Sequence, residues 1–221
     1  MGNCDAIVKI LLRRLAPSIF IAACAISSLQ AGAVDSGEVR PEEYAVYNAV
    51  LGNVQMPKEN AHALIVDTTL NFRCGWDSGN PIVLNGCGGM VMPPDTTEQV
   101  HELLRENWPH LEESTWQDLE KQNSRSSKLR DSFATSWKHK FIGGDSAEEK
   151  AKEWNSADCA FYLSRVGLNE KKTEAVVFVY FASYMKGVPS TGDYFLLRMD
   201  KVKGWELEGR VQYFVSDQQS R

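Results

Sequence analysis

The stretch AVVFVYF, residues 175–181, decides the fold class of this chain. If this stretch is a β-strand, its side chains are apolar on both faces. That is expected of a strand in a sheet that is covered on both faces. Residues 195–199 and 205–215 follow it, and both alternate apolar with polar side chains at a period of two. Residues 161–168 form another strand pattern before it, and short turns separate successive strands. The pattern therefore predicts a four-stranded antiparallel meander.

Helical patterns occupy much of the chain before these strands. Residues 41–52 begin with a proline and two glutamates and end at a glycine, which suits the two ends of a helix. Further helices are predicted over residues 95–108, from Ser114, over 133–142 and over 145–155, with a short strand over 63–66. Helices first and strands last indicate an α+β fold, with N-terminal helices packed on the C-terminal meander. The alternative is a cone-shaped α+β fold of the NTF2-like kind.

Residues 1–33 have the three parts of a secretory signal peptide. Basic side chains come first, at Lys9, Arg13 and Arg14. An apolar run over residues 15–29 follows, shorter than the roughly 20 residues that a membrane-spanning helix needs. Ala31 and Ala33 then give a small-x-small cleavage signal. We therefore expect cleavage after Ala33 and a single periplasmic or secreted domain over residues 34–221.

A second processing site competes with this one. Residues 21–24 read Ile-Ala-Ala-Cys, which resembles the bacterial lipobox whose cysteine is acylated and becomes the first residue. Lipidation at Cys24 would make the protein a membrane-anchored lipoprotein. The mature N-terminus distinguishes the two routes, because it is Val34 in the first and acylated Cys24 in the second. Membrane contact is expected only through the signal peptide or this lipid.

Composition is ordinary for a globular protein, with 43% hydrophobic and 24% charged residues and a formal net charge of −5. That balance argues against a general nucleic-acid-binding protein, so no nucleic-acid partner is expected. Residues 121–140 depart from it, because they hold many cations and one acid. The candidate residues for binding an anionic partner, a lipid headgroup or a cell-wall polymer are Arg125, Lys128, Arg130, Lys138 and Lys140. The alternative is the solvated face of a helix.

Three cysteines remain after removal of residues 1–33, and export would place them in an oxidising environment. Cys74 and Cys87 flank a segment rich in glycine and asparagine, which closes a short loop easily, so we expect a Cys74–Cys87 disulfide. Cys159 is then left over. We expect it to be a small buried apolar residue, the alternatives being a reactive thiol or an intermolecular disulfide.

Motifs with known chemistry are incomplete in this chain. His101-Glu102 begins like the helix of a zinc protease, but Arg105 stands where the second histidine is required. Residues 183–186 match Ser-x-x-Lys, yet the partner motifs of penicillin-recognising enzymes are missing. We therefore expect no metal, no cofactor and no catalytic residue. The leading hypothesis is a non-enzymatic envelope domain that binds, inhibits or assists a partner. The alternatives are an unrecognised envelope hydrolase and a carrier of a small apolar ligand.

Several segments together resemble a pattern found in uncharacterised exported bacterial proteins. They are residues 163–169, 174–179, 192–198 and 205–207, with a helix over 43–51 near the mature start. The likeness covers about 80 residues and is carried by turns and apolar strands. It implies a bacterial exported protein and a C-terminal antiparallel-strand signature. It implies no activity and no catalytic residue.

The disulfide can be tested by replacing Cys74 with serine. We expect Cys74→Ser to lower the free energy of unfolding by about 3 kcal/mol, because the closed loop no longer restricts the unfolded chain. Thiol titration of the unfolded protein should find one more free thiol than in the wild type. Unchanged melting and an unchanged thiol count would refute the Cys74–Cys87 pairing.

Overall fold

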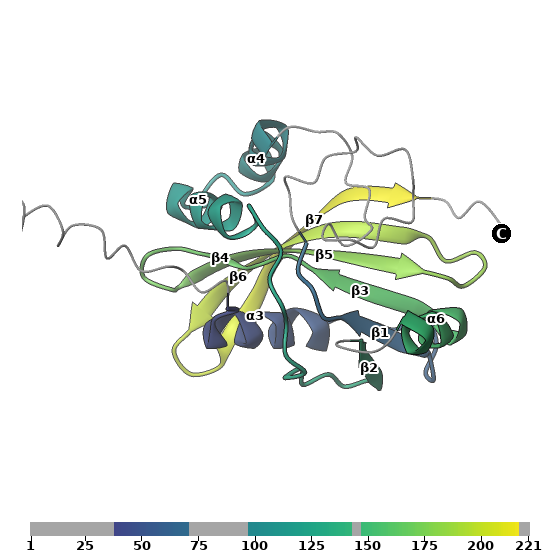
Figure 1. Cartoon of the computed structure of the whole chain (residues 1–221). Coiled ribbons are helices and arrows are strands. Elements are labelled where there is room, and N and C mark those ends of the chain that lie inside the picture. The colour runs from purple at the N-terminus through teal and green to yellow at the C-terminus, as the bar shows by residue number, and fades with distance from the viewer. Residues whose placement is uncertain (1–37, 71–96, 143–146, 217–221) are drawn as a thin grey trace, which may run out of the picture. The chain divides into compact units, whose positions relative to one another are not determined.

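The described strands form one mixed β-sheet in the computed structural model, which describes residues 38–70, 97–142 and 147–216 (Figure 1). The seven strands are β1 (Ala63–Val66), β2 (His139–Ile142), β3 (Cys159–Leu163), β4 (Gly167–Leu168), β5 (Glu174–Ser183), β6 (Ser190–Asp200) and β7 (Gly204–Ser216). Their order is β2-β1-β3-β5-β6-β7, and β4 pairs with β5. The described helices are α3 (Pro41–Gly52), α4 (Thr97–Asn107), α5 (Glu113–Gln122) and α6 (Ala147–Ser156). None of these four helices is both long and apolar enough to cross a membrane.

The α+β class is confirmed, but the prediction of a four-stranded meander is wrong. Strands β3, β5, β6 and β7 are antiparallel neighbours, as the meander requires. Strands β1 and β2 extend the same sheet in parallel beyond β3. The predicted strand over residues 161–168 is two strands, because the chain leaves the β3 ladder at Ser164 and resumes pairing at Gly167.

The helix predicted over residues 133–142 is also wrong. Its aromatic residues recur at helical spacing, but the segment is irregular until it forms strand β2. Strand β2 pairs with β1, and Phe133, Trp137 and Phe141 pack against the core on one face of the sheet. The aromatic side chains are therefore placed by contact with the sheet rather than by a helical backbone.

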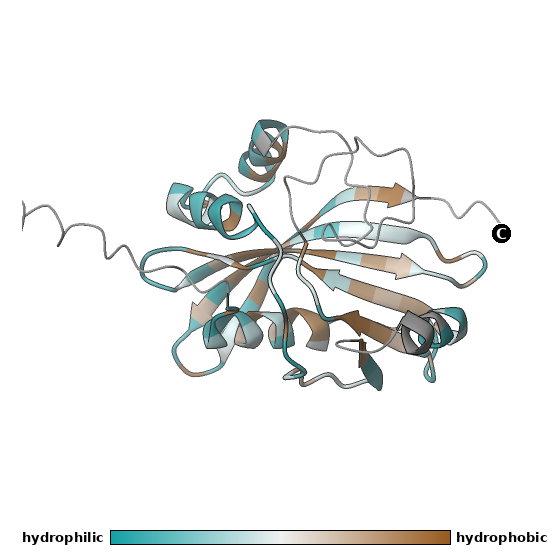
Figure 2. Ribbon diagram, in the orientation of Figure 1, coloured by the Kyte–Doolittle hydropathy of each residue, from teal (hydrophilic) through white to brown (hydrophobic). Residues whose placement is uncertain are grey.

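Both faces of the sheet are covered (Figures 1 and 2). On one face, α3 buries Val46, Tyr47, Val50 and Leu51 against Phe161 and other residues of β3 and β5. On the other face, α4 and α5 contribute Leu104, Trp116 and Leu119 to a second core. Buried side chains from α3, α4 and α5 thus pack against both faces of the described sheet.

Helix α5 lies unusually close to strand β4. A Cβ atom built on Gly167 would lie 2.4 Å from the carbonyl oxygen of Thr115 and 2.5 Å from Cβ of Leu119. Real Cβ atoms do not approach neighbouring atoms this closely, so only glycine permits the contact. This contact sets α5 directly beside the turn that joins β4 to β5.

Replacing Gly167 tests the importance of this contact. We expect Gly167→Ala to lower the free energy of unfolding by about 1–3 kcal/mol, because the added methyl group must push the α5 backbone away from β4. Gly52→Ala is the matched control, since a Cβ atom at Gly52 meets nothing within 4 Å. Urea unfolding of both variants gives the comparison. Equal changes in the two variants would contradict the close packing.

Candidate functional site

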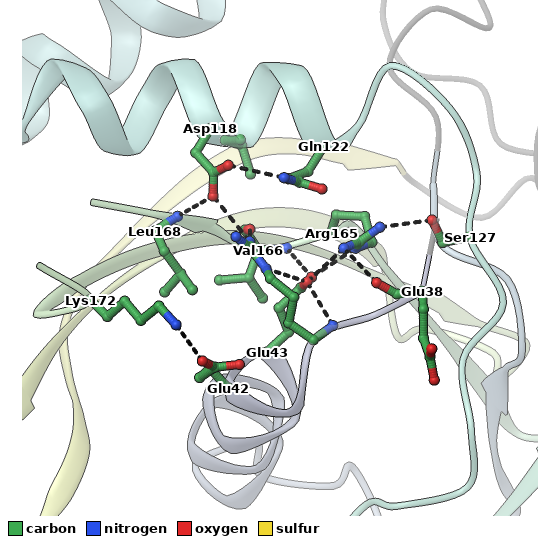
Figure 3. Close-up of polar contacts among 12 residues, drawn as sticks. Glu38, Glu42, Glu43, Asp118, Gln122, Ser127, Arg165, Val166, Leu168 and Lys172 are labelled. Carbon is green, nitrogen blue, oxygen red and sulfur yellow. Dashed lines mark hydrogen bonds and ion pairs between the residues drawn. The ribbon is translucent and has the colours of Figure 1, made fainter. Parts of the chain in front are cut away.

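A buried ion pair joins helix α3 to the segment between β3 and β4 (Figure 3). Nη2 of Arg165 lies 2.7 Å from Oε1 of Glu43, and Nε lies 2.8 Å from Oε2. The side chains of Glu43 and Arg165 are 0% and 2% exposed. The pairing is therefore bidentate and excluded from water, which is the arrangement in which an arginine–carboxylate pair is most directional.

The charge of Glu43 is maintained despite its burial. Burial by itself would raise the pKa of Glu43, but the hydrogen bonds and positive charge of Arg165 outweigh it. The backbone N–H of Val166 and the charge of Arg40 act in the same direction. The resulting pKa of Glu43 lies below its ordinary value, so the carboxylate is ionised at neutral pH.

The remaining polar groups of Arg165 are also satisfied. Its Nη1 donates to the hydroxyl of Ser127 at 2.9 Å, and its Nη2 donates to the carbonyl oxygen of Glu38 at 3.2 Å. Asn123, which follows α5, accepts from the backbone N–H of Arg165 and donates to its carbonyl oxygen. One arginine thus ties together α3, the end of α5 and the residues around 127.

Arg40 and Asp118 extend this network toward the surface. Nη2 of Arg40 lies 3.0 Å from Oδ2 of Asp118 and donates to the carbonyl oxygen of Val166 at 2.8 Å. The Asp118 carboxylate also accepts from the N–H of Leu168 and from the amide of Gln122 (Figure 3). Asp118 therefore holds α5 against β4 through fixed contacts.

Glu174 anchors the start of α5. Its carboxylate accepts from the backbone N–H of Glu112 at 2.9 Å and from the hydroxyl of Thr115. This places a negative charge at the positive end of the α5 dipole. On its other oxygen, Glu174 lies 2.7 Å from Nη1 of Arg198. The buried carboxylate thus connects α5 to strands β5 and β6.

An open pocket of about 380 Å³ lies where α3, α5 and the β4–β5 turn meet. Four of its lining residues lie on one face of α5, at the spacing that brings helical side chains together. The described lining residues are mostly polar: Arg40, Ser114, Gln117, Asp118, Lys121, Leu168, Asn169, Glu170 and Lys172. Helix α5 begins at Glu113, one residue before the expected cap, so Ser114 lies in its first turn.

The β4–β5 turn forms one wall of this pocket. Oδ1 of Asn169 accepts from the backbone N–H of Thr173 at 2.7 Å and of Glu174 at 3.1 Å. Lys172 has a φ of 53°, in the left-handed region that favours glycine. The ammonium of Lys172 pairs with the carboxylate of Glu42 on α3. The hydrogen bond from Lys172 lowers the pKa of Glu42.

The predicted basic stretch does not form one concentrated cationic surface. Lys128 pairs with Asp67 at 2.7 Å, Lys140 pairs with Glu153 at 2.6 Å, and Arg130 pairs with Glu38. Arg125 and Lys138 are exposed on the same irregular segment. The pairing acids come from three different parts of the chain, and the three cations are 49–72% exposed. The segment is not one helix, because only residues 121–122 belong to α5 and residues 139–140 belong to β2.

The predicted processing and disulfide residues lie outside the described residues. They are Cys24, Ala31, Ala33, Cys74 and Cys87. Cys159 is described: it is a free thiol on β3 and is fully buried. Burial raises the pKa of Cys159 to about 12, so the thiolate form is disfavoured and the expectation of a small buried residue is confirmed.

Two other groups of side chains contain a histidine, which could act as a metal ligand or as a catalytic base. His101 on α4 stacks on Trp116, with ring centroids 4.7 Å apart, and no cluster with metal-ligand character occurs in the described part of the chain. The hydroxyl of Ser156 lies 3.3 Å from Nδ1 of His62, and Nε2 of His62 lies 3.5 Å from Oε2 of Glu153. This second grouping is on the surface, and the Ser156 hydroxyl also donates to the carbonyl oxygen of Glu153.

Sequence reasoning missed the polar network behind the pocket. Glu43 was expected only to favour the start of a helix, and Asp118 carried no motif. The available signal was Arg165, a cation within the otherwise apolar and small run Leu163–Leu168. A buried arginine requires an acidic partner, but the sequence does not say which of the many carboxylates that partner is.

Comparisons with family models, with curated proteins and with solved structures found no match for this chain.

The ion pair leads to a prediction about pH. The pKa of Glu43 is lowered in the folded protein, so its stabilising contribution is present above the unfolded value of about 4.3 and is lost as pH falls through the folded value. We expect Glu43→Gln to lower the free energy of unfolding by about 3–5 kcal/mol at pH 7, because the Arg165 charge is left buried without its partner. The deficit should shrink as the pH falls below about 4, since the wild-type carboxyl is then protonated as well.

Urea unfolding measured from pH 7 to pH 3 checks this expectation. Glu42→Gln is the control, because the ion pair of Glu42 with Lys172 is exposed. This substitution should lower the free energy of unfolding by less than about 1 kcal/mol. A Glu43→Gln deficit that stays constant across this pH range would show that the charge of Glu43 is not what stabilises the fold.

Proposed function

We propose that this chain is an exported cell-envelope domain that binds a partner protein, as an inhibitor or accessory factor, and that the pocket beside α5 is its binding site. The observation that carries the proposal is the construction of the pocket. Its walls come from three elements that are locked together by buried charges, while its rim presents polar groups to solvent. Export is proposed from the signal-peptide pattern of residues 1–33.

The locked walls favour binding because little conformational freedom is lost when a partner arrives. The buried groups Glu43 and Arg165 and the half-buried Asp118 are each engaged in several hydrogen bonds. Glu43 and Arg165 therefore support the pocket from behind, and Asp118 forms part of its wall. Polar groups of Ser114, Gln117 and Lys121 line the open side of the pocket.

The chemistry of the lining favours binding over catalysis. Acid–base catalysis needs a proton donor or acceptor poised near the working pH. The described lining residues include no histidine or cysteine, and the Asp118 carboxylate is held by Arg40 and by two N–H donors. Such a site can hold a polar segment of another molecule, and Glu170 is the one other carboxylate among the described lining residues.

A capture experiment tests the proposal. Protein with a C-terminal tag, expressed with its leader and recovered from the periplasmic fraction, is incubated with envelope extract. We expect one saturable partner at micromolar concentration. Gln117→Trp, which fills the pocket mouth without changing its charge, should weaken capture at least about tenfold, since one blocked hot spot can dominate an interface.

Gln212→Trp is the matched control, because Gln212 is exposed on β7 and is not among the residues that line the pocket. It should capture the partner as the wild type does, and circular dichroism should show that both variants fold. Absence of any saturable partner would refute the function, and equal capture by both variants would place the binding site elsewhere.

An envelope hydrolase is the second candidate, and the Ser156–His62–Glu153 grouping is the observation in its favour. The hydroxyl of Ser156 lies 3.3 Å from Nδ1 of His62, and Nε2 of His62 lies 3.5 Å from Oε2 of Glu153. Nδ1 also lies 3.1 Å from the carbonyl oxygen of Ser156, so catalysis would require the tautomer in which Nδ1 accepts the hydroxyl proton instead. Hydrolysis of an activated ester by the wild type, with loss of that activity in His62→Gln, would select this candidate.

A further inference from the structure

Building on the proposed function, we propose that the pocket recognises the carboxylate of an acidic side chain in the partner protein, and that Lys121 and Lys172 are the two cations that bind it. Three cations line the pocket, and each comes from a different element: Arg40 precedes α3, Lys121 lies on α5, and Lys172 lies in the β4–β5 turn. The pocket is therefore a point where positive charge converges from three directions.

Arg40 is already committed to internal contacts. Its guanidinium lies 2.9 Å from Glu43 and 3.0 Å from Asp118, and it also donates to the carbonyl oxygen of Val166. Its side chain is 30% exposed, so it forms the inner wall of the site more than its rim. The side chains that would bind an incoming anion are therefore Lys121 and Lys172.

The two lysines are accessible and weakly engaged. Lys121 is exposed, and its ammonium makes no ion pair within the part of the chain that the structure describes. Lys172 pairs with Glu42, but the two side chains are 54% and 39% exposed. Exposed pairs of this kind contribute little free energy, so an incoming carboxylate can replace Glu42 at small cost.

The backbone at Lys172 adds an independent observation. A φ of 53° is unfavourable for a lysine, and glycine or asparagine would adopt it more easily. The turn nevertheless carries a lysine there, held by the hydrogen bonds that Asn169 makes to Thr173 and Glu174. We infer that the position is occupied for its ammonium group, which the turn holds at the edge of the pocket.

The anion expected here is a carboxylate on a peptide rather than a phosphate. Among the lining cations, Arg40 is paired with Asp118 and Lys172 with Glu42, and Asp118 and Glu170 also line the pocket. A singly charged carboxylate that takes the place of Glu42 keeps this balance, whereas a doubly charged phosphate would add a further negative charge beside both acids. The Ser114 hydroxyl and the Gln117 amide can pair with the backbone groups beside an acidic side chain. A pocket of about 380 Å³ suits a short peptide segment.

The inference is tested by NMR titration of the exported protein with two peptides. The first is acetyl-Gly-Ser-Glu-Glu-Ser-Gly-amide, and the second carries glutamine in place of both glutamates. We expect the acidic peptide to shift the backbone signals of residues 114–121 and 169–173, and to bind at least about fivefold more tightly than its glutamine counterpart. Lys121→Gln and Lys172→Gln should each weaken the acidic peptide about fivefold, as loss of one charged contact predicts.

Two further variants sharpen the test. Glu42→Gln should strengthen binding about two- to fivefold, because it removes the internal competitor for Lys172. Lys138→Gln is the matched charge control, since Lys138 is exposed outside the pocket, and it should leave the affinity unchanged. A merely structural role for Lys172 would not make Glu42→Gln bind more tightly.

Equal binding of the two peptides, or no loss in Lys121→Gln and Lys172→Gln, would overturn the inference. Tighter binding of inorganic phosphate than of the acidic peptide at the same residues would also overturn it. The capture experiment separates this failure from that of the proposed function. A partner that is lost with Gln117→Trp but retained with both lysine variants leaves the function standing and refutes carboxylate recognition. If no partner is captured while the peptides are discriminated, the proposed function fails and the carboxylate specificity of the pocket holds.

Discussion

The pairing of Glu43 with Arg165 is the constraint on which the rest of the structure depends. Both groups are withdrawn from water, and withdrawing a charge from water is costly unless its hydrogen bonds are replaced. The fold supplies the replacements from α3, from Asn123 and Ser127, and from the backbone of residues 38 and 166. A buried pair adds little net stability, but removal of one partner leaves an uncompensated charge. The segments that meet around Arg165 are therefore held in one arrangement.

The pocket is a consequence of that arrangement. Arg165 occupies the break between β3 and β4, and the break allows Gly167 to come under α5. Close contact at Gly167 then brings the polar face of α5 beside the β4–β5 turn, where Asp118 and Arg40 close the inner wall. The groups behind the polar rim can therefore rearrange only at a large cost in free energy. This combination of a rigid base with accessible lysines is the basis of our proposal that the pocket binds a polar segment.

Local patterns in the sequence predicted the elements whose residues decide their own conformation. Helix α3 has the predicted bounds, because Pro41 suits the first turn and Glu43 accepts from the backbone N–H of Arg40 at the helix start. Strand β1 was expected from its apolar run, and its burial on both faces follows from its central place between β2 and β3. The antiparallel strands were also expected: β5 from its apolar run, and β6 and β7 from their alternation and the short turns.

Elements that depend on distant partners could not be predicted in this way. Phe133, Trp137 and Phe141 have helical spacing, yet the preference of this segment is overridden by pairing of β2 with β1 and by burial of the aromatic rings on the sheet. The sequence by itself determined the α+β class, the ends of α3, the antiparallel strands and the burial of Cys159. Only the tertiary structure decided the parallel edge of the sheet, the partner of Arg165 and the meeting of Arg40, Lys121 and Lys172 at one pocket. The physical reason is range: capping and alternation act over a few residues, whereas charge pairing and sheet order join residues far apart in the chain.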